Sequence, residues 1–310
     1  MNKIRALVLT EYGGPDALRI SPVEPPVAGT GQVLVRVHAA GVNGLDWKLR
    51  QGHLRDAFPL QLPTVLGIEL AGVVEAVGAG VTRLRKGDRV MGQLGGLGAY
   101  AELVAVNEAN LSPVPDSLNF AQAAALPLAS VAAWQSLHFA GPIRSGQRIL
   151  IQGAAGALGG FAVQYAHQAG AVVYATALGS HAGYVRSLGA DHVIAYDKEQ
   201  FESVVSDIDL VLDYIGGEVL SRSWSMLAED GAIVSTAAPA IEANTPVGRR
   251  GLWFMNTSDA ARLQAIGEDV AHGRLQSKVG AVVRFDELPA AIERNRTQPQ
   301  LGKTVVTLSD

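Results

Sequence analysis

Hydrophobic and polar residues alternate in the first third of the chain, and glycine and proline interrupt the alternation. Three segments carry the pattern: Gln32–Ala39, Ala71–Val77 and Asp88–Met91. Alternation with a period of two is typical of strands that bury one face, and Lys86-Gly87-Asp88 supplies a turn signal. We therefore expect this part of the chain to be rich in β-structure.

From about Phe120 the pattern changes to short apolar runs that alternate with segments of helical period. The runs expected to form buried strands are Arg148–Gln152, Ala171–Thr176, His192–Ala195, Asp209–Leu212 and Ala232–Ser235, and the segments expected to form helices are Ala157–Gln168 and Gly183–Leu188. Such alternation predicts right-handed βαβ units and a parallel sheet.

The tail returns to β-type segments at Ala281–Phe285 and Lys303–Leu308. The whole pattern therefore predicts an α/β protein in which a Rossmann domain, a doubly wound parallel sheet formed by residues 120–276, is inserted into a β-rich domain. Residues 1–119 and 277–310 form this second domain, which we expect to bind the substrate.

Composition narrows the choice of partners. The chain has 310 residues, a net charge of -4 and no cysteine. The negative charge argues against nucleic acid as a partner, and the missing cysteines exclude disulfides, thiolate metal sites and a cysteine nucleophile. The longest stretch without Asp, Glu, Lys or Arg, residues 117–143, contains polar residues and is expected to be buried helix and loop rather than a membrane span. Since residues 1–10 show no signal-peptide pattern, we expect a cytoplasmic protein.

A glycine-rich turn gives the strongest indication of chemistry. The apolar run Ile149–Gln152 leads through Gly153 into a segment of small residues that opens the predicted helix. Its members are Ala154, Ala155, Gly156, Ala157, Leu158 and Gly159. Between a strand and a helix, such a turn lets backbone N–H groups approach a pyrophosphate. The alternative is a turn that needs small residues for packing alone.

The end of the next strand favours NADPH over NADH. NAD-binding proteins usually place Asp or Glu about 20 residues after the glycines, on the ribose 2′-hydroxyl. The segment from Tyr174 through Thr176 to His181 has no acid. Ser180 can donate a hydrogen bond to a 2′-phosphate, and His181 or Arg186 can add positive charge. Alternatively, Ser180 and His181 are ordinary solvated loop residues.

Several motifs together resemble the medium-chain dehydrogenase/reductase family, and in particular its zinc-independent quinone oxidoreductases, which are related to zeta-crystallin. The motifs occur in the family's order over nearly the whole chain: Leu66–Gly78, Lys86–Val90, Ala124–Leu128, Gly153–Gly156, Leu188–Asp191, Asp213–Gly217 and Gly302–Val305. The resemblance implies a GroES-like domain combined with a Rossmann domain, and a homodimer that pairs edge strands of the Rossmann sheets.

The resemblance also implies the absence of a catalytic zinc ion. Where zinc-dependent relatives carry a zinc-binding Cys, this chain has Asn43, and where they carry a zinc-binding His, it has Ile68 beside Glu69. The four-cysteine structural zinc lobe is missing as well. A catalytic zinc needs about three protein ligands, so we expect no metal.

The remaining candidate residues come from the same resemblance. Asn43 resembles the residue near the nicotinamide and its ribose, and Asp46 and Lys48 follow it. Lys48 stands where many quinone reductases have Tyr; it can hydrogen-bond a substrate carbonyl, or it is a surface residue paired with Asp46. Residues implied to lie near the cofactor are Tyr196, Ala237, Ala238 and Phe254. For Tyr196 and Phe254 the alternative is a role in packing alone.

These observations predict a reductase that moves hydride from NADPH to a small quinone or α,β-unsaturated carbonyl. We also consider an enoyl-thioester reductase, which needs a basic patch that the sequence does not show, and a non-catalytic NADPH-binding sensor or structural protein. Turnover with a quinone would distinguish the last possibility from an enzyme.

Overall fold

The computed structural model describes residues 2–308, which form two compact units. Unit 1 contains residues up to 128 together with 258–274 and the segment from 278 onward, and unit 2 contains residues 129–257 and 275–277. These packing units differ in their bounds from the predicted domains, 1–119 with 277–310 and 120–276. The domain boundaries remain a prediction.

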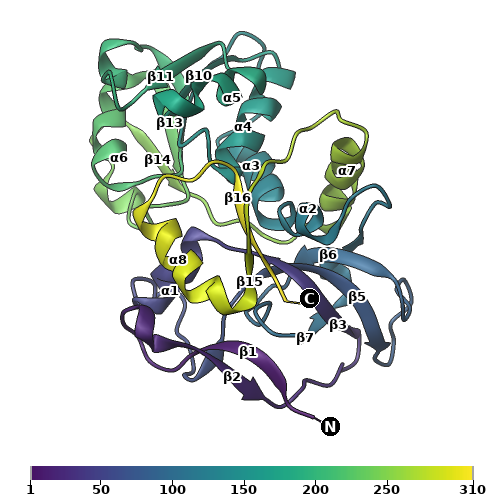
Figure 1. The fold of residues 1–310 in the computed structure, drawn as a ribbon. Coiled ribbons are helices and arrows are strands. Elements are labelled where there is room, and N and C mark those ends of the chain that lie inside the picture. Colours follow the sequence, from purple (N-terminus) through teal and green to yellow (C-terminus); the bar gives the residue numbers. More distant parts are fainter. Residues whose placement is uncertain (1, 309–310) are drawn as a thin grey trace. The chain divides into compact units, whose positions relative to one another are not determined.

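Unit 1 is built mainly from antiparallel strands. One sheet has the order β2 (Leu18–Val23), β1 (Ile4–Leu9) and β4 (Thr64–Val65). A larger sheet has the order β15 (Val279–Arg284), β16 (Lys303–Thr307), β3 (Gln32–Gly41), β5 (Glu69–Val77), β6 (Arg89–Gln93) and β8 (Leu111–Pro113), with β7 (Leu103–Asn107) also paired to β3. Its helices are α1 (Gly44–Arg50), α2 (Phe120–Ala124), α7 (Ala260–Ala271) and α8 (Leu288–Thr297). Segments far apart in sequence meet here, since α8 packs on α1 (Figure 1).

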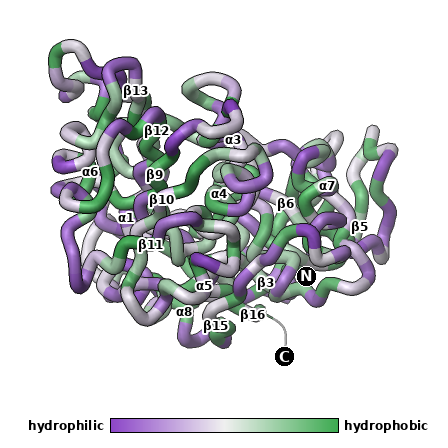
Figure 2. Tube along the Cα trace, turned by 90° about the horizontal axis from the view of Figure 1, so that it is seen from above, coloured by the Kyte–Doolittle hydropathy of each residue, from purple (hydrophilic) through white to green (hydrophobic). Residues whose placement is uncertain are grey.

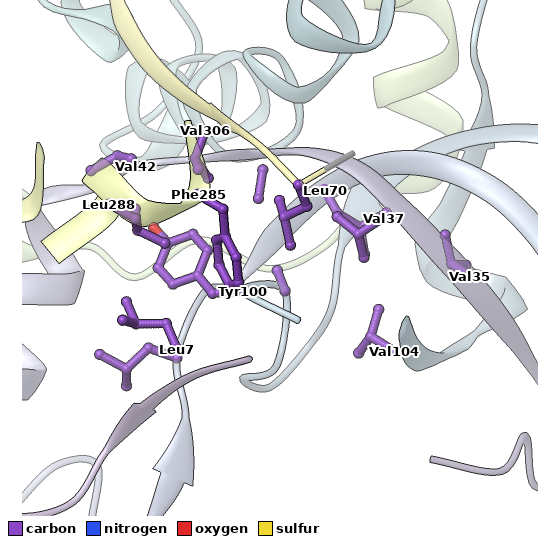
Figure 3. Close-up of a cluster of buried hydrophobic side chains, with 14 of the residues drawn as sticks. Leu7, Val35, Val37, Val42, Leu70, Tyr100, Val104, Phe285, Leu288 and Val306 are labelled. Carbon is purple, nitrogen blue, oxygen red and sulfur yellow. The ribbon is translucent and has the colours of Figure 1, made fainter. Parts of the chain in front are cut away.

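Alternating strand residues build the core of unit 1. Val33, Val35 and Val37 of β3 are buried, as are Leu7 of β1 and Val306 of β16. Figure 3 shows Leu7, Val35, Val37 and Val306 in one hydrophobic cluster with Phe285, Leu288 and Tyr100. Burial of this apolar surface holds strands from both ends of the sequence in one sheet.

Unit 2 is a doubly wound sheet in which every described pairing is parallel. Its strand order is β11 (His192–Ala195), β10 (Val172–Ala177), β9 (Arg148–Gln152), β12 (Ile208–Asp213), β13 (Leu227–Ser235) and β14 (Arg250–Trp253). Helices α4 (Ala157–Gln168), α5 (Ala182–Ser187) and α6 (Gly217–Ser223) connect strands, and α3 (Pro127–Phe139) precedes the sheet. In chain order this is the 3-2-1-4-5-6 arrangement of dinucleotide-binding folds, which confirms the predicted parallel sheet.

Element bounds differ from the sequence pattern mostly at the ends. The strand predicted over Ala171–Thr176 runs one residue later, and the strand predicted over Ala232–Ser235 begins earlier, at Leu227. Phe285 follows β15 in a 3-10 turn.

Hydrophobic and hydrophilic residues alternate over short distances along the tube in Figure 2. Over residues 2–308, no helix has the length and apolar character needed to cross a membrane.

Candidate active site

The glycine-rich turn lies where β9 passes into α4, at the point where the strand order of unit 2 reverses. Gly153 has φ +81°, a left-handed conformation that favours glycine. A Cβ at Gly159 would lie 2.3 Å from the carbonyl oxygen of Gly153, so only glycine lets the helix approach the turn this closely. Gly156 begins α4 without a side-chain cap. The first helical turn therefore has no side chain that accepts its N–H groups, which suits an anion.

Thr176, at the end of β10, fixes this turn. Its hydroxyl donates to Oε1 of Gln152 over 2.7 Å and accepts from the N–H of Gly153 over 3.2 Å, while the carbonyl of Thr176 accepts from the N–H of Ala154 over 3.0 Å. Thr176 is buried. The structure thus gives Thr176 a role in shaping the turn, and its predicted contact with the cofactor remains a prediction.

Two residues to which we assigned no role organise the next loops along the same sheet edge. The buried Asp213 carboxylate, at the end of β12, accepts N–H groups from Ile215 and Gly216 and the hydroxyl of Ser235 over 2.6 Å. Ser235 ends β13, and its Oγ accepts the N–H groups of Ala237 and Ala238, each over 3.1 Å. An acid directly after a buried strand was the available signal in the sequence. This chain of hydrogen bonds fixes the predicted cofactor segment Ala237-Ala238.

The other predicted cofactor residues of unit 2 have different surroundings. Ser180 is exposed and His181 half-buried, both in a 3-10 turn after β10. The side chain of Tyr196 is half-exposed in the turn after β11. Phe254 is buried, with its ring edge-on to Phe139 at a centroid distance of 5.2 Å, so its surroundings are those of a core residue.

In unit 1, Asn43 ends the loop before α1, and its side chain makes three hydrogen bonds within the protein. Its Nδ2 donates to the carbonyl of Gly41 over 3.1 Å and to Oε1 of Glu69 over 2.9 Å, and its Oδ1 accepts from Nζ of Lys303 over 2.5 Å. Both amide protons are thereby used within the protein. The side chain therefore has no free donor, and any further hydrogen bond to it has to be accepted by Oδ1.

Glu69 and Lys303 form a buried ion pair that sequence reasoning missed. Their charged atoms lie 2.5 Å apart, and the two side chains are 0% and 5% exposed. The second carboxylate oxygen of Glu69 accepts the N–H of Leu128 over 2.7 Å. Gly41 makes room for the pair, because a Cβ there would lie 2.3 Å from the Glu69 carboxylate. The pair sets the orientation of the Asn43 amide.

Asp46 lies in the first turn of α1 and is fully buried. One oxygen, Oδ2, accepts the backbone N–H of Asn43 over 2.7 Å and the hydroxyl of Tyr100 over 2.6 Å, while Oδ1 has no hydrogen-bond partner. Burial raises the pKa of Asp46 to about 6, against the opposing effects of these bonds and of the Lys303 charge. Burial and the Asp46 charge also raise the pKa of Tyr100, which keeps the phenol protonated.

Two family models match the chain. Residues 29–116 match the alcohol dehydrogenase GroES-like domain, and residues 188–306 match a model described as zinc-binding dehydrogenase. A 2-methylene-furan-3-one reductase of Solanum lycopersicum is 35% identical over 319 residues, which cover 98% of this chain and 79% of the relative. The chain belongs to the medium-chain dehydrogenase/reductase family.

Other members of this family are equally informative. An NADPH-dependent alkenal/one oxidoreductase of Arabidopsis thaliana, described as chloroplastic, is 35% identical over 317 residues, with 98% of this chain and 79% of the relative covered. The solved structure of a quinone oxidoreductase from Coxiella burnetii superimposes with a TM-score of 0.92 at 30% identity and covers 99% of this chain and 100% of the other. The GroES-like and Rossmann architecture expected from the sequence is thereby confirmed.

Asn43 and Ile68 stand at the positions where zinc-dependent relatives carry ligands. Asn43 contacts Lys303 and Glu69, and Ile68 is a buried apolar residue. Within residues 2–308, no group of three or more His, Asp or Glu side chains is arranged to hold a metal ion. The described side chains around Asn43 therefore form an ion pair and an amide network rather than a ligand set.

Lys48 is the remaining predicted catalytic residue of unit 1. It is half-buried on α1, and its ammonium nitrogen lies 5.7 Å from the ring centroid of Trp47. The hydrogen bonds found for Asp46 go instead to Asn43 and Tyr100. The catalytic roles of Asn43, Asp46 and Lys48 remain predictions.

Proposed function

We propose that this protein is an NADPH-dependent reductase that transfers hydride to quinones or to α,β-unsaturated carbonyls without a metal ion. The observation that carries the proposal is the 35% identity, over 98% of the chain, to a relative named NADPH-dependent alkenal/one oxidoreductase. The quinone oxidoreductase that shares the fold at 30% identity supports quinones as acceptors.

The residues of the glycine turn fit a dinucleotide. Gly159 lets α4 begin close to the turn, and the uncapped start of the helix leaves N–H donors for a pyrophosphate. We propose that residues 154–159 bind it, that Ala237 and Ala238 line the nicotinamide end, and that Tyr196, Ser180 and His181 lie at the adenosine end. Bound NADPH supplies the hydride from C4 of its nicotinamide.

We propose separate roles for the three polar residues of α1 and its cap. Asn43 accepts one hydrogen bond through Oδ1, which suits a ribose hydroxyl. Asp46 is a positioning residue, because it is fully buried and acts on the backbone of Asn43. Lys48 donates to the substrate carbonyl. When hydride reaches the β-carbon of an enone, the C=C electron pair moves toward the carbonyl oxygen, and Lys48 stabilises the resulting enolate until water protonates the α-carbon.

The test is NADPH and NADH oxidation followed at 340 nm with 1,4-benzoquinone, 9,10-phenanthrenequinone and a 2-alkenal, with and without chelator. We expect chelator-insensitive turnover that is faster with NADPH. Lys48→Ala should lower kcat with the enone roughly 10- to 100-fold, whereas Lys86→Ala, an exposed lysine of the same unit, should not change it. NADPH binding without turnover of any acceptor would instead indicate a non-catalytic binding protein.

We further propose a homodimer and a cytoplasmic location. Strands β11 and β14 form the two edges of the described parallel sheet, and edge strands offer unpaired backbone groups to a second copy. Mass measured by light scattering on the intact protein tests the dimer. The Arabidopsis relative is described as chloroplastic, so location is tested by fractionation of the source cells.

A further inference from the structure

Two segments of unit 2 lie side by side at the carboxyl ends of neighbouring strands. Strands β10 and β11 are parallel with Ala177 opposite Ala195, and the N–H of Tyr196 donates to the carbonyl of Ala177 over 3.1 Å. The turn at residues 196–198 therefore lies against the 3-10 turn Gly179–His181. In doubly wound dinucleotide-binding sheets, the end of the second strand is where the 2′ group of the adenosine ribose is recognised.

The turn after β11 places two opposite charges against Gly179. The Asp197 carboxylate accepts the N–H of Gly179 over 2.7 Å. The Lys198 ammonium nitrogen lies 3.2 Å from the position that a Cβ on Gly179 would take. The spacing from the glycine motif does not predict either residue, because that spacing points to the end of β10 and both residues follow β11.

Asp197 and Lys198 differ in whether their charged groups are already bonded within the protein. Asp197 is engaged with a backbone donor, and the neighbouring Glu199 carboxylate accepts the N–H of Ala195 over 3.2 Å. Within residues 2–308, no carboxylate lies within ion-pair distance of the Lys198 ammonium. The loop thus combines a carboxylate that holds the backbone with an available cation.

An available cation at this place distinguishes the two nicotinamide cofactors. NADPH differs from NADH only by the 2′-phosphate, and a phosphate attracts an ammonium group through charge-assisted hydrogen bonds. We propose that Lys198 selects NADPH by binding its 2′-phosphate, and that Asp197 is a positioning residue that holds the Gly179 backbone beside it. This inference rests on the proposed function for its cofactor.

The experiment measures two quantities on the intact protein: kcat/KM for NADPH and NADH, and calorimetric binding of 2′,5′-ADP and 5′-AMP, which differ by the same phosphate. Lys198→Ala should lower kcat/KM for NADPH and the affinity for 2′,5′-ADP about 10- to 100-fold. The kcat/KM for NADH and the affinity for 5′-AMP should stay within about 2-fold of the unaltered protein. Lys198→Arg should retain most of the preference. Arg144→Ala, which removes an exposed cation before β9, serves as the control and should change neither ligand pair.

Variants of Asp197 test the positioning role. Asp197→Asn keeps an oxygen that can accept the Gly179 N–H and should preserve the cofactor preference, whereas Asp197→Ala should reduce it. If both variants impair NADH alone, Asp197 binds the ribose hydroxyl and the positioning role is wrong.

The outcomes separate this inference from the proposed function. An unchanged NADPH-to-NADH ratio in Lys198→Ala, with normal turnover by the unaltered protein, overturns the inference and leaves the function intact. Tight binding of 2′,5′-ADP that depends on Lys198, without turnover of any acceptor, supports the inference and overturns the function.

Discussion

At the scale of single residues, the main feature is a set of charges buried in unit 1. Asp46 and Glu69 are both inaccessible, and Lys303 is the one cation bonded to this group in the described chain. Burying a charge is costly unless it is paired and hydrogen-bonded. Since Lys303 pairs directly with Glu69, Asp46 depends on Tyr100 and the Asn43 backbone, and its Oδ1 has no partner.

The raised pKa of Asp46 predicts a pH-dependent stability. Because the pKa is about 6 in the folded protein and 3.8 ordinarily, the protonated carboxyl favours folding. Its full contribution is present below about pH 4 and is lost as pH rises through about 6, a change of about 3 kcal/mol. Asp46→Asn should therefore gain stability relative to the unaltered protein between pH 4 and 7, measured by urea unfolding. The exposed Asp56→Asn is the control, and parallel pH profiles for all three proteins would contradict the prediction.

Removing one member of the buried Glu69–Lys303 pair should strongly lower the free energy of unfolding. Lys303→Met leaves the Glu69 carboxylate buried without its cation, which costs about 3–5 kcal/mol in free energy of unfolding. The double variant Lys303→Met, Glu69→Gln should recover a large part of that loss, because no net charge then remains buried at the pair. Denaturant unfolding of the four proteins in the cycle measures the coupling, and additive losses would show that the pair is not coupled.

At the scale of elements, the turn between β9 and α4 depends on close backbone contact. Gly159→Ala would bring a Cβ within 2.3 Å of the Gly153 carbonyl oxygen, so the start of α4 has to move. We expect a loss of about 1–3 kcal/mol in stability and at least about 10-fold weaker NADPH binding. Gly183→Ala in α5, where a Cβ meets nothing within 4 Å, is the matched control and should keep binding unchanged. Calorimetric titration with NADPH measures both.

Periodicity predicted the elements of unit 2 well, and the network of unit 1 poorly. The strand over Arg148–Gln152 and the helix over Ala157–Gln168 coincide with β9 and α4, since a buried strand and an amphipathic helix each leave a local pattern. The Glu69–Lys303 pair leaves none, because its partners are 234 positions apart and meet only through the pairing of β3 with both β5 and β16. Lys198 could not be predicted for a similar reason, because it follows β11 whereas its neighbour Gly179 follows β10.

At the scale of the whole molecule, each unit has its own core, and the glycine turn belongs to unit 2. A ligand that binds only the folded state stabilises it by about 2.7 kcal/mol when present at 100 times its Kd. NADPH should therefore raise Tm by a few degrees. Chelator should change neither that shift nor the rate of turnover, as measured by differential scanning fluorimetry alongside the 340 nm assay. Loss of the shift with chelator would indicate a bound metal.

The long sequence separation of the Asn43–Lys303 bond has a consequence for how the chain is made. Asn43 and Glu69 leave the ribosome more than 230 residues before Lys303, whereas the last segment of unit 2, residues 275–277, is synthesised before Lys303. Until β16 is synthesised, the carboxylate of Glu69 has no ammonium partner and the sheet of unit 1 lacks a strand. Every residue of unit 2 is thus synthesised before the strand that supplies the cation of the buried pair, and the network around Asn43 can be completed only near the end of translation.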